Sequence, residues 1–216
     1  MKIRIIVILM LSGSIFSSCS EPMSGENSLF GKITISGQAS GHDVTGLLLN
    51  AYVIDNQSSI EFTPVLASTR FTNENNFSII LPPPPDSIME VISNNTFEVF
   101  KCFEQANITN PGIKISNVVV FFISSDSVHG AMEKVTPYGI KPFKYVEYFF
   151  SNGATKVTGQ YRNYNGYDSV TTNMDLDIKY GWNIISHEIV FHSTYYHEYN
   201  LTTGDRPECE WRSYIW

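Results

Sequence analysis

The sequence predicts an all-β protein made of two small antiparallel β-sandwich-like units in tandem, which follow a cleaved signal and a flexible tether. Three observations lead to this class: turn-forming residues recur at short intervals, no segment has a strong helical period, and several runs alternate apolar and polar residues. The chain has 216 residues, of which 43% are hydrophobic and 16% charged. That length and composition are enough to bury a core.

The first residues have the parts of a secretory signal. A cationic start at Lys2 and Arg4 precedes an apolar run at residues 5–11, which is too short to span a bilayer as a helix. Residues 15–19, Ile-Phe-Ser-Ser-Cys, then resemble the lipobox of bacterial lipoproteins, in a relaxed form found in Bacteroidota-type proteins. The resemblance implies that Cys19 is acylated and becomes the first residue after cleavage; a plain signal peptide is the alternative.

Lipid at Cys19 would hold the protein at a membrane of the cell envelope, expected to be the outer membrane, facing the periplasm or the outside. Acyl chains bind membranes because each buried methylene contributes about 0.8 kcal/mol. Polar residues at 20–29 are expected to form the tether.

Loss of Lys2 and Arg4 with the leader changes the formal net charge from −7 to −9. An acidic chain without a basic run argues against a nucleic-acid partner.

The first unit is expected at residues 30–126. Its predicted strands lie at residues 32–36, 46–55, 65–71, 77–81 and 114–124. The spacing over residues 33–82 resembles the carboxypeptidase-regulatory, transthyretin-like β-sandwich module, with Asn75 or Asn76 where the family usually has a turn glycine. Asparagine tolerates the left-handed backbone that such a turn needs. The resemblance implies a folding unit or spacer and no activity.

The second unit is expected at residues 127–216. Predicted strands lie at residues 144–151, 155–162, 170–179 and 184–192, the last two joined as a hairpin by the turn at 180–183. The aromatic run at 145–150, with the segments 158–161 and 176–183, is similar to two-part lipoproteins of anaerobic bacteria that have no assigned activity. This resemblance supports the envelope location and provides no activity that could be transferred to this chain.

No motif of a known catalytic centre occurs. The sequence has no GxSxG, phosphate loop, dinucleotide fingerprint or paired CxxC, so we expect no catalytic residue, no cofactor and no enzyme activity. His187, His192 and His197 come closest to a metal set, but residues five apart on a strand face opposite sides. We expect surface, hydrogen-bonded histidines and no metal site. Asp175 and Asp177 are expected on the solvated face of a strand.

Two cysteines remain once Cys19 is assigned to the lipid. Cys102 and Cys209 are an even number in an oxidising compartment, which is typical of a disulfide. Such a bond would join the two units and contribute a few kcal/mol. The sequence alone does not show whether their Cα atoms lie close enough for a disulfide, so two free thiols are the alternative.

Three short Asp-Ser-apolar segments resemble the O-glycosylation acceptor of Bacteroidota-type exported proteins. The serines are Ser87, Ser127 and Ser169, each near a predicted loop. The resemblance implies sugar attachment at these hydroxyls.

Aromatic residues near the C-terminus are the remaining sign of binding. The candidates are Tyr195, Tyr196, Tyr199, Trp211 and Trp216. They suit either the core of a sandwich or a platform that stacks on sugar rings or docks a protein. The function predicted is therefore that of a membrane-anchored exported lipoprotein with a non-catalytic surface or binding role. The alternative is a glycan-binding accessory lipoprotein of a nutrient-uptake system.

Overall fold

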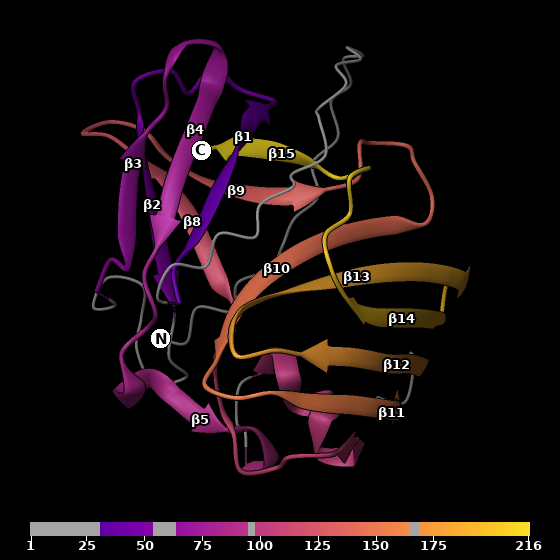
Figure 1. The fold of residues 1–216 in the computed structure, drawn as a ribbon. Helices are drawn as coiled ribbons and strands as arrows, with labels where there is room; N and C mark the ends of the chain where they lie inside the picture. The colour runs from indigo at the N-terminus through magenta and orange to yellow at the C-terminus, as the bar shows by residue number, and fades with distance from the viewer. Residues whose placement is uncertain (1–30, 54–63, 95–97, 165–168) are drawn as a thin grey trace, which may run out of the picture.

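The structure, a computed structural model, describes residues 31–53, 64–94, 98–164 and 169–216 (Figure 1). It confirms the all-β class, since strands make up 60% of the described residues. The signal, Cys19 and the tether lie outside the described residues. Among the residues described, no helix has the length and apolarity needed to cross a membrane.

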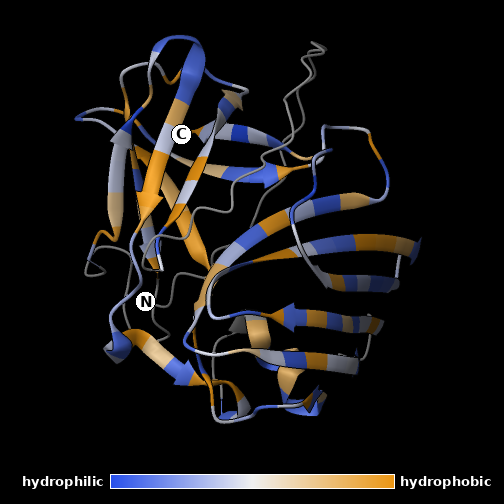
Figure 2. Ribbon diagram, viewed as in Figure 1, coloured by the Kyte–Doolittle hydropathy of each residue, from blue (hydrophilic) through white to orange (hydrophobic). Residues whose placement is uncertain are grey.

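One group of strands curls around a first hydrophobic core. In spatial order these strands are β4 (Asn76–Leu81), β1 (Ile33–Ser40), β15 (Glu210–Ile215), β9 (His129–Val135), β8 (Val119–Ser124), β2 (Leu48–Val53) and β3 (Ala67–Arg70). Figure 2 shows hydrophobic residues along β4 and β8, where alternate side chains point into this core. The first core includes Ile35, Leu49, Ile79, Tyr148 and Trp211.

A second group of strands forms a curved sheet beside the first. Its order is β10 (Phe143–Ser151), β13 (Gly181–Ser193), β14 (Tyr196–Thr203), β12 (Ser169–Ile178), β11 (Thr155–Tyr164) and β6 (Asn107–Ile108). β10 also pairs with β9 at Tyr145 and Val146, so the described strands belong to one connected sheet.

Short elements lie between β4 and β8. They are η3 (Asp86–Ile88), β5 (Met89–Val91), η4 (Ile92–Asn94), η5 (Glu98–Gln105) and β7 (Lys114–Ser116), while η2 (Asn73–Asn75) precedes β4. Of these, η4, η5 and β7 contribute to the second core. Phe100 and Phe103 on η5 stack with ring centroids 5.1 Å apart, and Phe100 meets Phe149 of β10 edge to face. Ile185 and Leu201 join them in this core. η5 therefore covers one end of the curved sheet.

The chain does not divide at the predicted boundary between residues 126 and 127. β8 and β9 lie on either side of that boundary and pair with each other, for example at Phe121 and Met132. β15, from the end of the chain, lies between β1 and β9. The first core is therefore built from both halves of the sequence, which two units in sequence order would not give.

The predicted hairpin at residues 170–192 is wrong. β12 and β13 are not hydrogen-bonded to each other, because β14 lies between them, parallel to β12 and antiparallel to β13. The break between the strands lies at residues 179–180, so β13 begins inside the predicted turn at 180–183. Gly181 has a φ of +97°, and the Asn183 side chain bonds the backbone of Lys179. The solvated face of β12 is confirmed, since Asp175 and Asp177 are exposed.

Trp211 lies at the centre of the first core and is 5% exposed. Its ring meets Phe77 and Phe121 edge to face, at centroid distances of 5.3 and 5.5 Å, and stacks on Tyr148 at 6.1 Å. A Cβ on Gly37 would approach the indole to 2.5 Å, so this position needs glycine. The suggestion that Trp211 binds ligand is therefore corrected: it is a core residue.

Replacement of the core tryptophan should strongly destabilise the protein. We expect Trp211→Ala to lower the free energy of unfolding by about 3–5 kcal/mol, because a large buried ring leaves a cavity. The matched control is Trp216→Ala, since Trp216 is 69% exposed and its loss should change stability by less than about 0.5 kcal/mol. Urea denaturation of the full-length protein measures both values, and similar effects of the two variants would contradict this account of the core.

Candidate functional site

A pocket of about 330 Å³ lies on the curved sheet beside η5. Pockets that bind small molecules have volumes from about 300 Å³ upward and combine apolar walls with a few polar groups. The aromatic and polar residues around it are Lys101, Tyr145, Glu147, Tyr161, Asn163, Thr172, His187 and Tyr199. They come from η5 and from β10, β13, β14, β12 and β11, so the pocket depends on the whole curved sheet.

The strand register brings these side chains to one face. Tyr145 of β10 lies opposite His187 of β13, and His187 lies opposite Leu201 of β14. On the other side of β14, Tyr199 lies beside Thr172 of β12, which faces Tyr161 of β11. Because alternate residues of a strand share a face, residues far apart in the chain line a single surface.

Glu147 and His187 form a buried polar contact at the pocket. Glu147 Oε2 lies 2.7 Å from His187 Nε2, and the side chains are 22% and 5% exposed. The Tyr145 ring stacks on the imidazole at a centroid distance of 4.2 Å and an angle of 10°. Within the described part of the chain, neither Glu147 Oε2 nor His187 Nε2 has a hydrogen bond of good geometry. Buried polar atoms are usually hydrogen-bonded, so this contact is an unusual feature of the pocket.

The pocket environment keeps its phenols and thiol protonated. Burial, and then the negative charge of Glu147, raise the pKa of Tyr145 well above its ordinary value. Burial also raises the pKa of Tyr199. The pKa of Cys102, which adjoins the pocket, rises to about 11 for the same reason. At neutral pH these groups are uncharged, and the tyrosines can donate hydrogen bonds.

Of the five aromatic residues predicted to bind ligand, Tyr199 lines the pocket. Tyr195 and Tyr196 lie at the β13–β14 turn, where Tyr195 is 62% exposed and Tyr196 stacks on His192. Trp216 is exposed beyond β15, and its backbone N–H donates to the His129 carbonyl.

Sequence reasoning did not propose six of the aromatic and polar lining residues as ligand-binding residues: Lys101, Tyr145, Glu147, Asn163, Thr172 and His187. A usable signal was present: His187 is in phase with Ile185 and Ile189 on the inward face of β13. Glu147 is likewise in phase with Phe149 on β10. Ionisable residues in the apolar phase of a strand are candidates for function or for buried pairs.

The histidines do not share one environment. His187 is 4% exposed, so the expectation of a surface histidine is wrong at this position. His192 contacts Glu198 at 3.0 Å, and the His197 ring lies edge-on to Phe191 at 5.0 Å. The described residues contain no group of three or more His, Cys, Asp or Glu side chains that could hold a metal ion.

The structure does not support a disulfide between Cys102 and Cys209. Both are buried free thiols, and they belong to different cores. Cys102 lies on η5 with the second core, whereas Cys209 lies in the first core near the Lys144 carbonyl. The two half-chains are therefore held together by strand pairing and side-chain packing.

The predicted O-glycosylation serines differ in exposure. Ser87 in η3 and Ser127 in the turn between β8 and β9 are exposed. Ser169 begins β12, is half-buried, and donates its backbone N–H to the Tyr195 carbonyl. Sugar attachment remains a prediction at all three, with Ser87 and Ser127 the more accessible.

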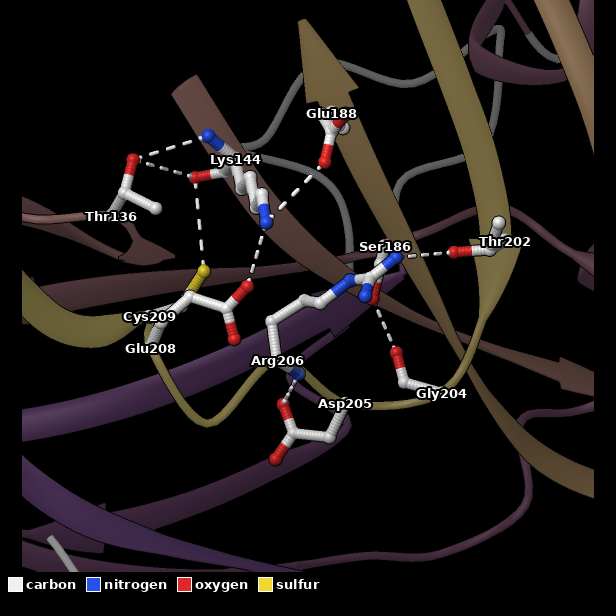
Figure 3. A network of polar contacts seen from close by, with 10 residues as sticks. All are labelled: Thr136, Lys144, Ser186, Glu188, Thr202, Gly204, Asp205, Arg206, Glu208 and Cys209. Atoms are coloured by element: carbon white, nitrogen blue, oxygen red, sulfur yellow. Dashed lines mark hydrogen bonds and ion pairs between the residues drawn. The ribbon is translucent and has the colours of Figure 1, made fainter. Parts of the chain in front are cut away.

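A polar network secures the segment that joins β14 to β15 (Figure 3). Lys144 Nζ lies 2.8 Å from Glu208 and 3.3 Å from Glu188. The hydrogen bond to Glu208 raises the pKa of Lys144, and the same bond lowers the pKa of Glu208. Arg206 donates to the Thr202 hydroxyl, and the Ser186 hydroxyl donates to the Gly204 carbonyl. These contacts fix the connection between the two groups of strands, a structural role.

Comparison with known proteins gives no relative. No family model matches the chain, and no similar protein is found among curated proteins or solved structures. The geometry of the pocket is therefore the basis for a functional proposal.

Both thiols should resist alkylation in the folded protein. With a pKa of about 11, each is almost wholly protonated near pH 8, and the thiolate is the reactive form. We expect iodoacetamide to label Cys102 and Cys209 slowly in native full-length protein and rapidly in urea without reductant. Peptide mapping reads out each site. A peptide linking the two cysteines, or rapid native labelling, would contradict the structure.

Proposed function

We propose that the protein is a lipid-anchored, non-catalytic binding protein of the cell envelope, and that its pocket takes a small sugar as ligand. The observation that carries the proposal is the pocket on the curved sheet, with its aromatic walls and polar groups. An accessory role in nutrient uptake follows naturally from an anchored sugar-binding protein, because capture at the membrane raises the local concentration of the nutrient.

The chemistry of the pocket suits a sugar. A sugar ring has an apolar face of C–H groups, which packs on aromatic rings such as Tyr161 and Tyr199. Its hydroxyls need hydrogen-bond partners, which Asn163, Thr172 and Glu147 can supply. Both donors and acceptors are present, so a ligand with alternating polar and apolar surface is favoured over a purely apolar one.

The anchor is supported by the leader and by residues 15–19. A short apolar run, small residues before Cys19 and a polar segment after it suit a lipid-modified N-terminus. Two or three acyl chains hold a protein at a membrane far more firmly than one chain.

Sugar binding should depend on the pocket tyrosine and not on the exposed one. We expect Tyr199→Ala to weaken sugar binding about tenfold, because stacking of aromatic rings is worth up to about 1.5 kcal/mol. The matched control, Tyr195→Ala, removes an exposed tyrosine and should leave the affinity unchanged. Saturation-transfer NMR and calorimetry on full-length protein in detergent, with a panel of monosaccharides, give the affinities. If no sugar binds, or if only Tyr195→Ala weakens binding, the proposal fails.

Membrane attachment should require Cys19. We expect labelled palmitate to enter the wild-type protein and Cys19→Ala to abolish both the label and membrane retention, since the lipid is expected on Cys19. Fractionation of expressing cells reads out both effects, with Cys209→Ala as the matched control that keeps the label. A Cys19→Ala protein that remained at the membrane would refute the anchor.

A further inference from the structure

The pocket has one acidic side chain among its lining residues, Glu147, and one of its carboxylate oxygens contacts His187. Oε2 is buried against His187 Nε2, at 2.7 Å, and that oxygen has no accessible surface of note. The side chain as a whole is nevertheless 22% exposed. The accessible surface of Glu147 therefore lies elsewhere on the side chain than at Oε2, and Glu147 is among the residues that line the pocket.

The surroundings of Glu147 favour a positive group. Burial is the main cause of the raised pKa of Tyr145, and the nearby charges of Glu147 and Glu133 raise it further. Tyr145, Tyr161 and Tyr199 line the same pocket, with the Tyr145 ring stacked on His187. Aromatic faces and a carboxylate together attract an ammonium group by cation–π and ionic contact.

Two lining residues can carry positive charge. Lys101 reaches the pocket from η5 and has an interaction of its own. His187 contacts Glu147 and is covered on one ring face by Tyr145. Lys101 offsets the charge of Glu147 over the pocket as a whole, so the attraction for a cation is local to the Glu147 carboxylate, which favours a ligand with one ammonium group over a polycation.

We propose that the preferred ligand is an amino sugar, whose protonated amine meets the Glu147 carboxylate while its ring packs on the pocket tyrosines. This inference rests on the proposed sugar-binding function and specifies its ligand class. The amine supplies a hydrogen-bond donor and a positive charge for the carboxylate. The hydroxyls of the sugar bind Asn163 and Thr172. An N-acetylated or neutral sugar of the same ring size offers no such charge.

The test compares three ligands that differ at one carbon. Glucosamine, glucose and N-acetylglucosamine are titrated into full-length protein in detergent by calorimetry near pH 6, where a free amine is protonated. We expect glucosamine to bind about tenfold more tightly than the other two, as one favourable charged contact of about 1.4 kcal/mol gives. Higher salt should reduce this preference, because a partly exposed ion pair is screened.

Variants assign the preference to one carboxylate. Glu147→Gln keeps the shape of the side chain and should reduce the affinity for glucosamine to the affinity for glucose. The control Glu188→Gln removes a carboxylate of the neighbouring strand that pairs with Lys144, and should leave the preference unchanged. If Glu147→Gln does not fold, wild-type protein near pH 10 provides the test, since loss of the ligand's own charge should remove the preference.

The outcomes separate the two proposals. Equal binding of all three sugars would overturn the amino-sugar inference and leave the sugar-binding function standing. A glucosamine preference that survives Glu147→Gln, or that persists near pH 10, would also overturn the inference. If no sugar binds, both the amino-sugar inference and the proposed sugar-binding function are wrong.

Discussion

The two faces of β10 are the constraint on which the rest of the structure depends. Val146 and Tyr148 point into the first core, where Tyr148 stacks on Trp211. Tyr145 and Glu147 face the pocket, and Phe149 continues that face into the second core. Because side chains alternate along a strand, a slip of one residue would exchange these faces. Packing of the first core therefore fixes the side chains of the pocket.

Long-range pairing around β10 adds to this coupling. β15 lies between β1 and β9, so the last described strand completes the sheet that the first one begins. The buried Lys134 pairs with Asp205, and Lys144 holds Glu208, so the segment leading into β15 is tied to β9 and β10. Removal of the Asp205 carboxylate would leave Lys134 as an unpaired buried charge, which would lower the stability of the fold. The contacts that stabilise the fold thus also hold the pocket in shape.

The positions of the strands were predicted from the sequence more successfully than the pairing of one strand with another. Alternation at residues 170–178 located β12 and its solvated face, because burial of one sheet face follows a period of two. It could not show that β14 separates β12 from β13, since local turn chemistry at Gly181 suits a hairpin as well. Tyr199 was proposed from aromatic density alone. The contact of Glu147 with His187 was not predictable, because it depends on the pairing of β10 with β13.

The central claim is that the pocket formed by this face of β10 is the binding site, and a crystal structure of the protein with glucosamine tests it most directly. The account predicts the sugar between η5 and the curved sheet, with its amine within about 3 Å of the Glu147 carboxylate and its ring against Tyr199. Sugar at the turn near Tyr195, or a vacant pocket at a glucosamine concentration that saturates binding in solution, would contradict it.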